Sequence, residues 1–408
     1  MPVQDYGGSI SGGSTVQHIL TLNAGSSSIK FALFEHGAEP VERLRGEVDG
    51  LGTRAPHLQA KQDNQAIADE RLDAAKAADH EAALDAVLEL LRKSVGHTAI
   101  EAVGHRVVHG GVEFTQPVAL DAASFDRLEK LTPLAPMHQP HNLAGIRAAQ
   151  RAFPDALQVA CFDTAFHRVH PWVNDTYALP REFYDQGIRR YGFHGLSYEY
   201  VTSRLKQIAP SAERAVIMHL GNGASMCATR DGRSVGSTMG FTALDGLPMG
   251  TRCGELDPGV VLYLLQEKRM SAEEITDLLY KRSGLKGLSG LSQDMRELES
   301  AGTPEAAQAI DYFVFRIRRE LGAMAAILSG LEAIVFCGGI GENAWRIRAR
   351  VCHGFEWLGI ELDDARNQAG ETVISTDRSR ARVFVIRTDE ETMIARHAAQ
   401  LLAQPVSP

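Results

Sequence analysis

The sequence predicts a duplicated α/β protein, and three glycine-containing turns lead to that prediction. An apolar run at residues 216–218 leads into the turn HLGNG at 219–223, and a second run at 224–229 returns from it. A similar strand, small-residue turn and strand occupy residues 18–37. Because the same module occurs twice along the chain, we expect two similar domains whose turns converge on one ligand.

The third turn follows another short apolar run. Residues 333–337, AIVFC, lead into the segment GGIGEN at 338–343 and then into a helical pattern. Glycine permits close approach of an anion to backbone N–H groups, and a helix N-terminus favours negative charge. Taken alone, such a turn is more often a plain surface hairpin, so it is the set of three that indicates a binding site.

The remaining elements follow from periodicity and from helix start and stop signals. We expect helices at 80–95, 121–131, 142–152, 197–208 (with Ser197 as N-cap), 260–267, 272–281 and 304–328, and a last helix ending near residue 402. Strands are expected at 102–111, 156–162 and 382–386, an exposed excursion at 41–79 and a hinge at 169–180. The long loop at 241–259 holds Arg252, and loops of that length are usually functional.

Composition bounds the function. The 408 residues are 44% hydrophobic and 23% charged, as in an ordinary globular protein, and the net charge is −9. That charge argues against general nucleic-acid or membrane-surface binding, although it allows a local cationic pocket. Five cysteines without a CxxC pair predict reduced thiols and a cytoplasmic location. The polar, glycine-rich stretch at 1–17 predicts a disordered tail, and polar residues interrupt the apolar stretch 321–340, which argues against a membrane span.

Two alternatives arise from single motifs. The segment 339–344 matches GxGxxA after a strand, with Glu361 and Asp363 near the position of a ribose-binding acid, so a dinucleotide-dependent dehydrogenase is a minor alternative. The P-loop pattern is absent from the sequence. Histidine pairs without an HExxH motif do not predict zinc; they favour hydrogen-bonded loop histidines or anion binding about equally, at His105/His109, His138/His141 and His167/His170.

Three charged residues have unusual surroundings. Arg106 and Arg252 lie in apolar or glycine-rich segments, where a guanidinium fork for a carboxylate or phosphate is favoured over a structural salt bridge. Asp163 ends an apolar strand, where it is either the N-cap of the following helix or a carboxylate linked to a metal.

Taken together, these stretches resemble the acetate kinase family. The matching strings lie in family order between residues 20 and 391, and they are LTLNAGSSSIKF, GHRVVHGG, LAPMHQPHN, CFDTAFH, YGFHGLS, HLGNGAS, MGTRCGELDPG, SQDMRE, GGIGENA and TDEE. The resemblance implies a duplicated α/β fold of the actin-like type, shared by acetate and sugar kinases, heat-shock chaperones and actin. It also implies a homodimer and the Mg²⁺-ATP-dependent phosphorylation of acetate to acetyl phosphate and ADP, with Mn²⁺ as another usable ion.

The resemblance also carries roles to individual residues. Asp163 matches the catalytic aspartate, and His194 and Arg252 match the pair that steadies the transition state. Asn23 and Glu390 match the magnesium site. The residues matching substrate-binding positions are Arg106 for the carboxylate, His138 beside the phosphoryl path, and Val108, Met137, Phe193 and Ala243 in the acyl pocket. Those matching nucleotide-binding positions are Lys30, His219, Leu220, Gly221, Asn222, Gly223, Asp294, Met295, Arg296, Gly339, Ile340, Gly341, Glu342 and Asn343.

The acyl pocket departs from the usual pattern of the family. Ala243 stands where proline is common, and Met137 stands where leucine is common. Replacing proline with alanine removes bulk, so we expect propionate to be a competent substrate, and a propionate- or butyrate-preferring kinase is the alternative within the family.

For the whole chain, the resemblance implies an N-terminal domain at 18–165 plus 388–408 and a C-terminal domain at 166–387. A binding or assembly ATPase on the same fold is the alternative of another class. In such a protein Arg106, Asp163, His194 and Arg252 would share no convergent role.

Overall fold

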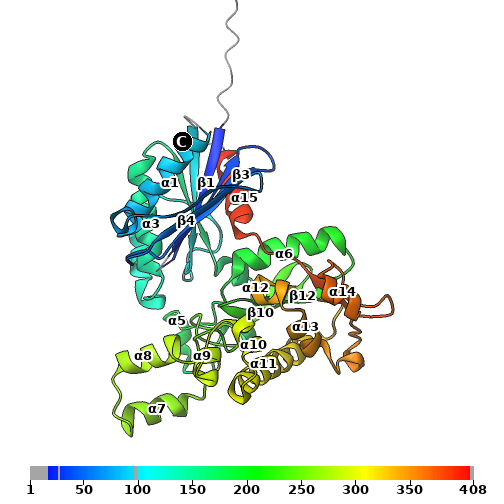
Figure 1. Ribbon diagram of the computed structural model, residues 1–408. Helices are drawn as coiled ribbons and strands as arrows, with labels where there is room; N and C mark the ends of the chain where they lie inside the picture. The colour runs from blue at the N-terminus through cyan, green and yellow to red at the C-terminus, as the bar shows by residue number, and fades with distance from the viewer. Residues whose placement is uncertain (1–16, 26–27, 96–98, 405–408) are drawn as a thin grey trace, which may run out of the picture. The chain divides into compact units, whose positions relative to one another are not determined.

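The computed structural model describes residues 17–25, 28–95 and 99–404 (Figure 1). The tail expected at 1–17 lies outside these residues except for its last one. The chain divides into two compact units. Unit 1 holds Met1–His105, Ala144–Val159 and Ala395–Pro408, and unit 2 holds Arg106–Leu143 and Ala160–Ile394. The expected domain boundaries differ from this division and stay a prediction about the duplication.

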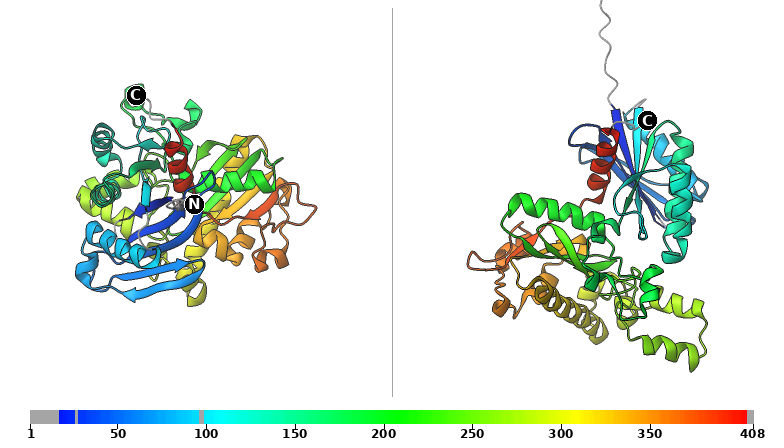
Figure 2. Two further views of the ribbon diagram at one scale, coloured as in Figure 1. Left: turned by 90° about the horizontal axis from the view of Figure 1, so that it is seen from above. Right: turned by 180° about the vertical axis from the view of Figure 1, so that it is seen from behind.

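Unit 1 is built on a mixed sheet. Its strands follow the order β5-β4-β3-β2-β1-β6-β8, and β6 and β8 continue into unit 2. They are β1 (Gln17–Ala24), β2 (Ser28–Glu35), β3 (Val41–Asp49), β4 (His57–Gln62), β5 (Gln65–Arg71), β6 (Ala99–Val107) and β8 (Leu157–Phe162). Helices α1 (His80–Val95) and α3 (Gln139–Ala152) lie on one face and α15 (Glu390–Leu402) on the other (Figure 2).

The expectation of an exposed excursion at 41–79 is wrong. Three antiparallel strands extend the sheet there, and the short 3₁₀ helix η1 (Ala74–Ala77) follows them. Leu44, Val48 and Leu58 alternate with polar residues and join the core of unit 1. Alternation of this kind is the signal of a half-buried strand, and the high content of Ala, Asp and Gln obscured it.

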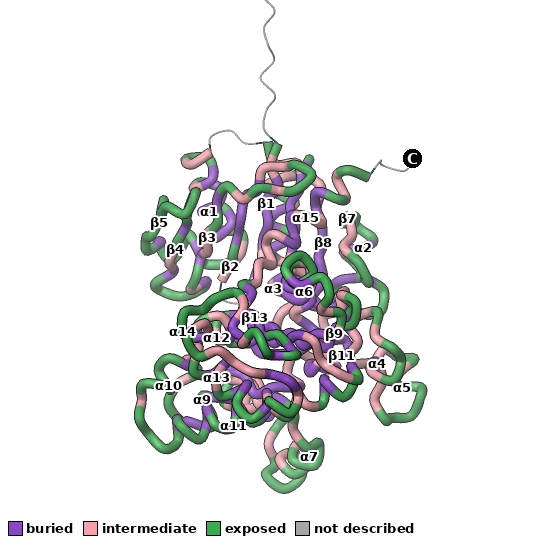
Figure 3. Tube along the Cα trace, turned by 90° about the vertical axis from the view of Figure 1, so that its right-hand side faces the viewer, coloured by how far each residue is buried: buried purple, intermediate pink, exposed green. Residues whose placement is uncertain are grey.

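Unit 2 contains the second sheet, of order β11-β10-β9-β12-β13. Its strands are β9 (Arg214–Leu220), β10 (Ala224–Arg230), β11 (Arg233–Ser237), β12 (Ala333–Cys337) and β13 (Arg382–Val385). The helices α11 (Pro304–Leu328) and α13 (Trp345–Cys352) share one hydrophobic core with the sheet, and α6 (Gly195–Ile208) shares another. The central strands of both sheets are buried along most of their length (Figure 3).

The two sheets confirm the predicted duplication. Strand β1 is antiparallel to β2 and parallel to β6, and β9 is antiparallel to β10 and parallel to β12. The orders β3-β2-β1-β6-β8 and β11-β10-β9-β12-β13 are therefore equivalent. A mixed sheet of this order is not the parallel sheet of a dinucleotide-binding domain. Of the two candidate acids, Asp363 caps the helix α14 (Asp364–Ala369), and Glu361 pairs with Arg378.

Most expected helices are present. Three match their expected bounds, namely α1, α8 (Ala272–Lys281) and α11. Helices α2 (Ala122–Lys130), α3 and α7 (Pro258–Gln266) differ from expectation by one to three residues at their starts. The other elements are β7 (Val118–Ala119), η2 (Thr132–Leu134), η3 (Ala165–His167), α4 (Trp172–Asp175), α5 (Arg181–Asp185), α9 (Gly284–Ser289), α10 (Met295–Ala301), α12 (Gly338–Asn343) and η4 (Glu356–Leu358).

Candidate active site

The centre of the candidate site is an ion pair between the ends of two neighbouring strands. Arg106 donates from Nε to Asp163 Oδ1 at 3.0 Å and from Nη2 to Asp163 Oδ2 at 2.6 Å. The Asp163 backbone N–H is bonded to Val107, and its side chain is 1% exposed. Glu390, at the start of α15, has Oε2 3.7 Å from Arg106 Nε. One guanidinium therefore faces two carboxylates.

The charge balance of this group favours the ionised arginine. Burial lowers the pKa of Arg106, but the charges of Asp163 and Glu390 outweigh burial and raise it overall. A bidentate, buried pair of this kind holds both partners in one orientation. Asp163 does not act as a helix N-cap in this structure, because the following η3 has Thr164 at that position.

Helix α6 begins directly against Asp163. The Gly195 backbone N–H donates to the Asp163 carbonyl at 2.9 Å, and a Cβ at this position would lie 2.2 Å from that oxygen. The residue before it, His194, has a left-handed backbone with φ of 57° and occupies the N-cap position. The expectation of Ser197 as the N-cap is therefore wrong, because the helix begins two residues earlier.

His194 is held by its neighbours and is uncharged. Its Nδ1 lies 2.9 Å from Ser225 Oγ, and its ring stacks on His219 with the ring centroids 4.3 Å apart. Burial first, and then the charges of His219, Arg106 and Arg252, lower the pKa of His194 well below its usual value. Its Nε2 faces the turn between β9 and β10, where a Cβ on Gly223 would approach it to 3.2 Å. This imidazole can donate or accept one hydrogen bond without titrating near neutral pH.

Arg252 and His138 join the same group. Arg252 lies in the predicted long loop and donates from Nη1 to the Ala243 carbonyl at 3.0 Å. Burial and then the Arg106 charge lower the pKa of Arg252. Burial, Arg252 and Arg106 together lower the pKa of His138 to about 4. The structure thus brings His138, His194, Arg252 and the Arg106–Asp163 pair close enough for their charges to interact.

The predicted acyl-pocket residues line one small cavity. Its volume is about 10 Å³, which is room for roughly one water molecule or methyl group. The cavity is lined by Val108, Met137, His138, Phe193 and Ala243, as predicted, and also by Leu134, Ala135, Pro136, Thr242 and Tyr280. Tyr280 was missed because it belongs to α8, far along the sequence from every motif. With Tyr280 present, the alanine at position 243 leaves little spare volume.

A larger pocket, of about 620 Å³, brings the predicted nucleotide loops together. It is lined by Gly221, Asn222, Asp294, Met295, Arg296, Gly339, Ile340 and Asn343, as predicted, and by Gln293, Glu299 and Ala344, which were not predicted. Other predicted members lie elsewhere. Leu220 and Gly341 are buried, His219 stacks on His194, and Glu342 lines a different pocket.

Two predicted residues belong to unit 1. Asn23 and Lys30 are partners in the register of β1 and β2, on either side of the first turn. They therefore sit on the strand pair equivalent to β9 and β10. Ser26 and Ser27 of that turn lie outside the described residues.

The candidate site offers few side chains that could bind a metal ion. Among the described residues, no group of three or more His, Cys, Asp or Glu side chains could hold a metal by itself. Asp163 and Glu390 provide two carboxylates on one arginine. This set fits Mg²⁺, which takes one or two protein carboxylates and completes its shell with water and phosphate oxygens.

All five cysteines are free, and four of them are buried. The described part of the chain contains no helix long and apolar enough to cross a membrane.

Comparison with known proteins agrees with this geometry. Residues 18–396 match the model of the acetokinase family. The acetate kinase of Methylocella silvestris is 59% identical over 95% of this chain and 98% of its own length, and that of Rhizobium meliloti is 52% identical over 95% and 99%. Among solved structures, Porphyromonas gingivalis acetate kinase has a TM-score of 0.85 at 37% identity, covering 95% of this chain and 100% of its own.

A propionate kinase from Francisella tularensis has a TM-score of 0.87 at 37% identity, covering 93% of this chain and 98% of its own. The predicted fold class is thus confirmed by solved structures that span nearly the whole chain. The chain belongs to the acetokinase family, whose function is the phosphorylation of acetate by ATP.

Proposed function

We propose that this chain transfers the γ-phosphoryl group of ATP to acetate, giving acetyl phosphate and ADP in a reversible reaction. The observation that carries the proposal is the cluster of the Arg106–Asp163 pair, Arg252 and His194 beside a pocket of about 10 Å³. That pocket is lined by Val108 and Phe193, which are close to Arg106 and His194 in the sequence, and by Ala243, whose carbonyl Arg252 contacts. An acetate methyl group fits that volume, and its carboxylate would then face the arginines.

The chemistry asks little of the protein beyond positioning and positive charge. An acetate oxygen forms the new bond to the γ-phosphorus, and the bond from that phosphorus to the β–γ bridging oxygen breaks. A carboxylic acid titrates near pH 4, so the nucleophile is already ionised and needs no general base. Arg106 binds the carboxylate, while Arg252 and the neutral His194 contact the equatorial phosphoryl oxygens. His138 lies beside the phosphoryl path.

The divalent ion of this site is proposed to be Mg²⁺, with Mn²⁺ as a substitute. Asp163, Glu390 and Asn23 would hold it, directly or through its water ligands. When bound, the ion neutralises phosphate charge during transfer. Asp163 accepts hydrogen bonds in this arrangement, and its pairing with Arg106 fixes the direction of the carboxylate.

The nucleotide is proposed to bind in the 620 Å³ pocket with its phosphates toward the two glycine turns. Backbone N–H groups in such turns suit phosphate oxygens. Lys30 would contact the nucleotide from unit 1, which requires the two domains of the duplication, at 18–165 plus 388–408 and at 166–387, to close over it.

We further propose a homodimer in the cytoplasm. Helix α7 has no buried residue, and its Val260, Leu262, Tyr263 and Leu265 side chains are all exposed (Figure 3). An exposed apolar face of this kind is typical of a protein–protein contact. The free cysteines support a reducing compartment.

The test is hydroxylamine trapping of acyl phosphate with Mg²⁺-ATP and acetate, propionate or butyrate in turn. Acyl phosphate should form with acetate, and ATP turnover should depend on the carboxylate. ATP hydrolysis that is indifferent to every carboxylate would overturn the proposal in favour of a binding ATPase. Faster turnover with propionate or butyrate would identify the other acyl kinases of the family.

A further inference from the structure

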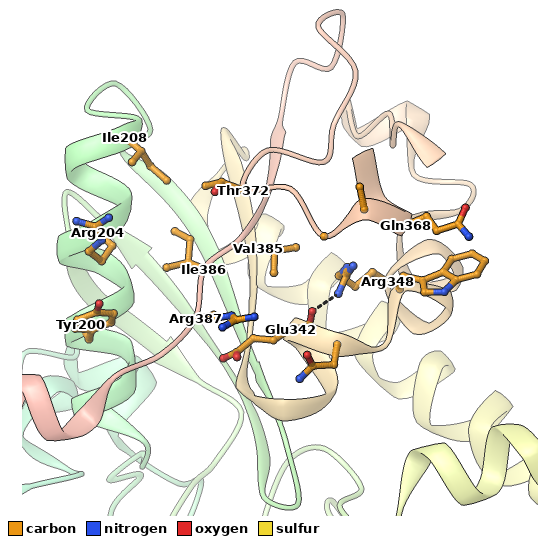
Figure 4. Close-up of a pocket in the computed structure, with 14 residues that line it drawn as sticks. Tyr200, Arg204, Ile208, Glu342, Arg348, Gln368, Thr372, Val385, Ile386 and Arg387 are labelled. Carbon is orange, nitrogen blue, oxygen red and sulfur yellow. Dashed lines mark hydrogen bonds between the residues drawn. The ribbon is translucent and has the colours of Figure 1, made fainter. Parts of the chain in front are cut away.

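A second large pocket of unit 2 has no part in the proposed reaction. It has a volume of about 550 Å³, within the range of small-molecule sites. Helix α6 contributes Tyr200, Arg204 and Ile208, and Arg387 follows β13 (Figure 4). The pocket shares Asn343 with the nucleotide pocket and shares no residue with the acyl pocket. It therefore adjoins the glycine turn 338–343 without belonging to the transfer site.

The charges on its wall favour an anion. Arg204, Arg348 and Arg387 line the pocket, and Glu342 is the only carboxylate among the described lining residues. Arg348 is buried, and its donors are engaged by Asn367 and by the carbonyls of residues 341 and 342. Arg204 and Arg387 are exposed residues, and Arg204 donates from Nη1 to Gln207 Oε1 at 2.5 Å, so both arginines keep donors that can meet a ligand.

Glu342 offsets only part of this positive charge, because three arginines line the pocket with it. Its Oε1 accepts hydrogen bonds from the backbone N–H groups of Gly338 at 2.9 Å and Thr388 at 3.1 Å. The carboxylate thus ties the glycine turn to the segment that precedes Glu390. Arg204 and Arg387 together carry more positive charge than the single carboxylate of Glu342 offsets. The pocket is therefore cationic, although the chain has a net charge of −9.

We propose that this pocket binds a small dianion, a dicarboxylate or a phosphate monoester, between Arg204 and Arg387, and that its occupancy is coupled to the nucleotide site. A guanidinium fork binds carboxylate and phosphate oxygens alike. The hydroxyl groups of Tyr200 and Thr372 supply two further hydrogen-bond donors in the same pocket.

The coupling follows a chain of hydrogen bonds. Thr388, next to Arg387, donates from Oγ1 to Ser197 Oγ at 2.7 Å, and Ser197 Oγ lies 2.8 Å from His219 Nδ1. His219 stacks on His194 of the transfer site. An anion that shifts Arg387 thereby acts on both the glycine turn and the two histidines. Such coupling is reciprocal, so the nucleotide must change the affinity for the anion by the same factor.

The first experiment measures binding to the full chain by isothermal titration calorimetry, with succinate and with glycerol 3-phosphate, in the presence of saturating ADP. We expect saturable binding of at least one probe at millimolar concentration or below. Arg204→Ala and Arg387→Ala should each weaken it about tenfold or more, as for the loss of a charged hydrogen bond. Lys206→Ala, on the same helix but outside the pocket, should leave it within twofold.

The outcomes show which class of anion binds, and whether it binds in this pocket or in the transfer site. Binding of succinate alone identifies a dicarboxylate, binding of glycerol 3-phosphate alone a phosphate monoester, and binding of both the shared oxyanion chemistry. The proposal is overturned by absence of saturable binding, or by binding that survives Arg204→Ala and is lost in Arg106→Ala, which would place the probe in the transfer site. Arg204→Lys keeps the charge and guards against a folding defect.

The coupling has its own readout. Increasing probe should change the KM for ATP at least twofold in the wild type and leave it constant in Arg204→Ala, whose kcat without probe should match the wild type. A constant KM in both proteins would refute the coupling. Binding of the probes does not rest on the proposed function, since a protein without carboxylate-dependent turnover could still bind them, whereas the coupling does rest on it.

Discussion

The two proposed substrate pockets of unit 2 are built in opposite ways. The acyl pocket has a volume of about 10 Å³ and is walled by side chains such as Val108 and Phe193, which are 4% and 2% exposed. The nucleotide pocket has about 620 Å³ and is formed by glycine turns and by surface side chains such as Arg296, which is 89% exposed. Because buried charges and close packing are sensitive to single changes, the pockets should differ sharply in their tolerance of substitution.

The largest effect on activity is expected at Arg252, which contacts Ala243 of the acyl pocket. Arg252→Ala should lower kcat by about 10³-fold or more with a modest change in KM, because this arginine is proposed to meet charge that develops in the transition state. Steady-state kinetics with acetate provides the measurement. Arg282→Ala, an exposed arginine after α8, is the matched control. A variant of Arg252 with near-normal kcat would refute the role.

Asp163→Asn should lower turnover by about 10–100-fold, the usual cost of losing a carboxylate that orients metal-bound water. Raising the Mg²⁺ concentration should restore part of it. The wild-type pH–rate profile should show no limb near pH 6–7 that the variant removes. If the wild-type profile does show such a limb, and if Asp163→Asn removes it and added Mg²⁺ restores no activity, then Asp163 acts as a proton acceptor instead.

Tyr280 tests whether volume sets the choice of acyl group. The sequence alone led us to expect propionate as a competent substrate, whereas the cavity around Ala243 has a volume of only about 10 Å³. Tyr280→Ala should raise the ratio of kcat/KM for propionate to that for acetate by about tenfold or more, the scale of one methylene group. Tyr280→Phe keeps the ring and should leave the ratio within about twofold. An unchanged ratio in Tyr280→Ala would remove Tyr280 from the specificity wall.

The smallest effect is expected at Arg296, on the open side. Its side chain pairs with Asp294, whose pKa is lowered to about 2 by this arginine at the surface. Exposed ion pairs contribute little, so Arg296→Ala should change the KM for ATP by less than about threefold and leave kcat unchanged. A large loss of ATP affinity would show that the nucleotide pocket tolerates substitution no better than the acyl pocket.

Much of the fold could be predicted from the sequence because its signals are local. The Asp231–Gly232 turn has positive φ at both residues, as a tight hairpin requires, and the amphipathic helix α8 carries its own capping box at Ser271 and Glu274. The motifs around Arg106, Asp163 and Arg252 likewise predicted a binding site, because charged residues are unusual in apolar or glycine-rich segments. Each of these signals lies within about ten neighbouring residues.

Other features depended on distant parts of the chain. Strands β3–β5 have weak composition signals and are strands because the edge of β2 offers hydrogen bonds. Tyr280 reaches the acyl pocket, and Arg204 and Arg387 reach a common cavity, only after separate elements have packed. By itself the sequence determined which elements form and which residues carry charge. Tertiary structure decided which of them share a pocket and how large that pocket is, since volume and burial are properties of packed elements rather than of any one segment.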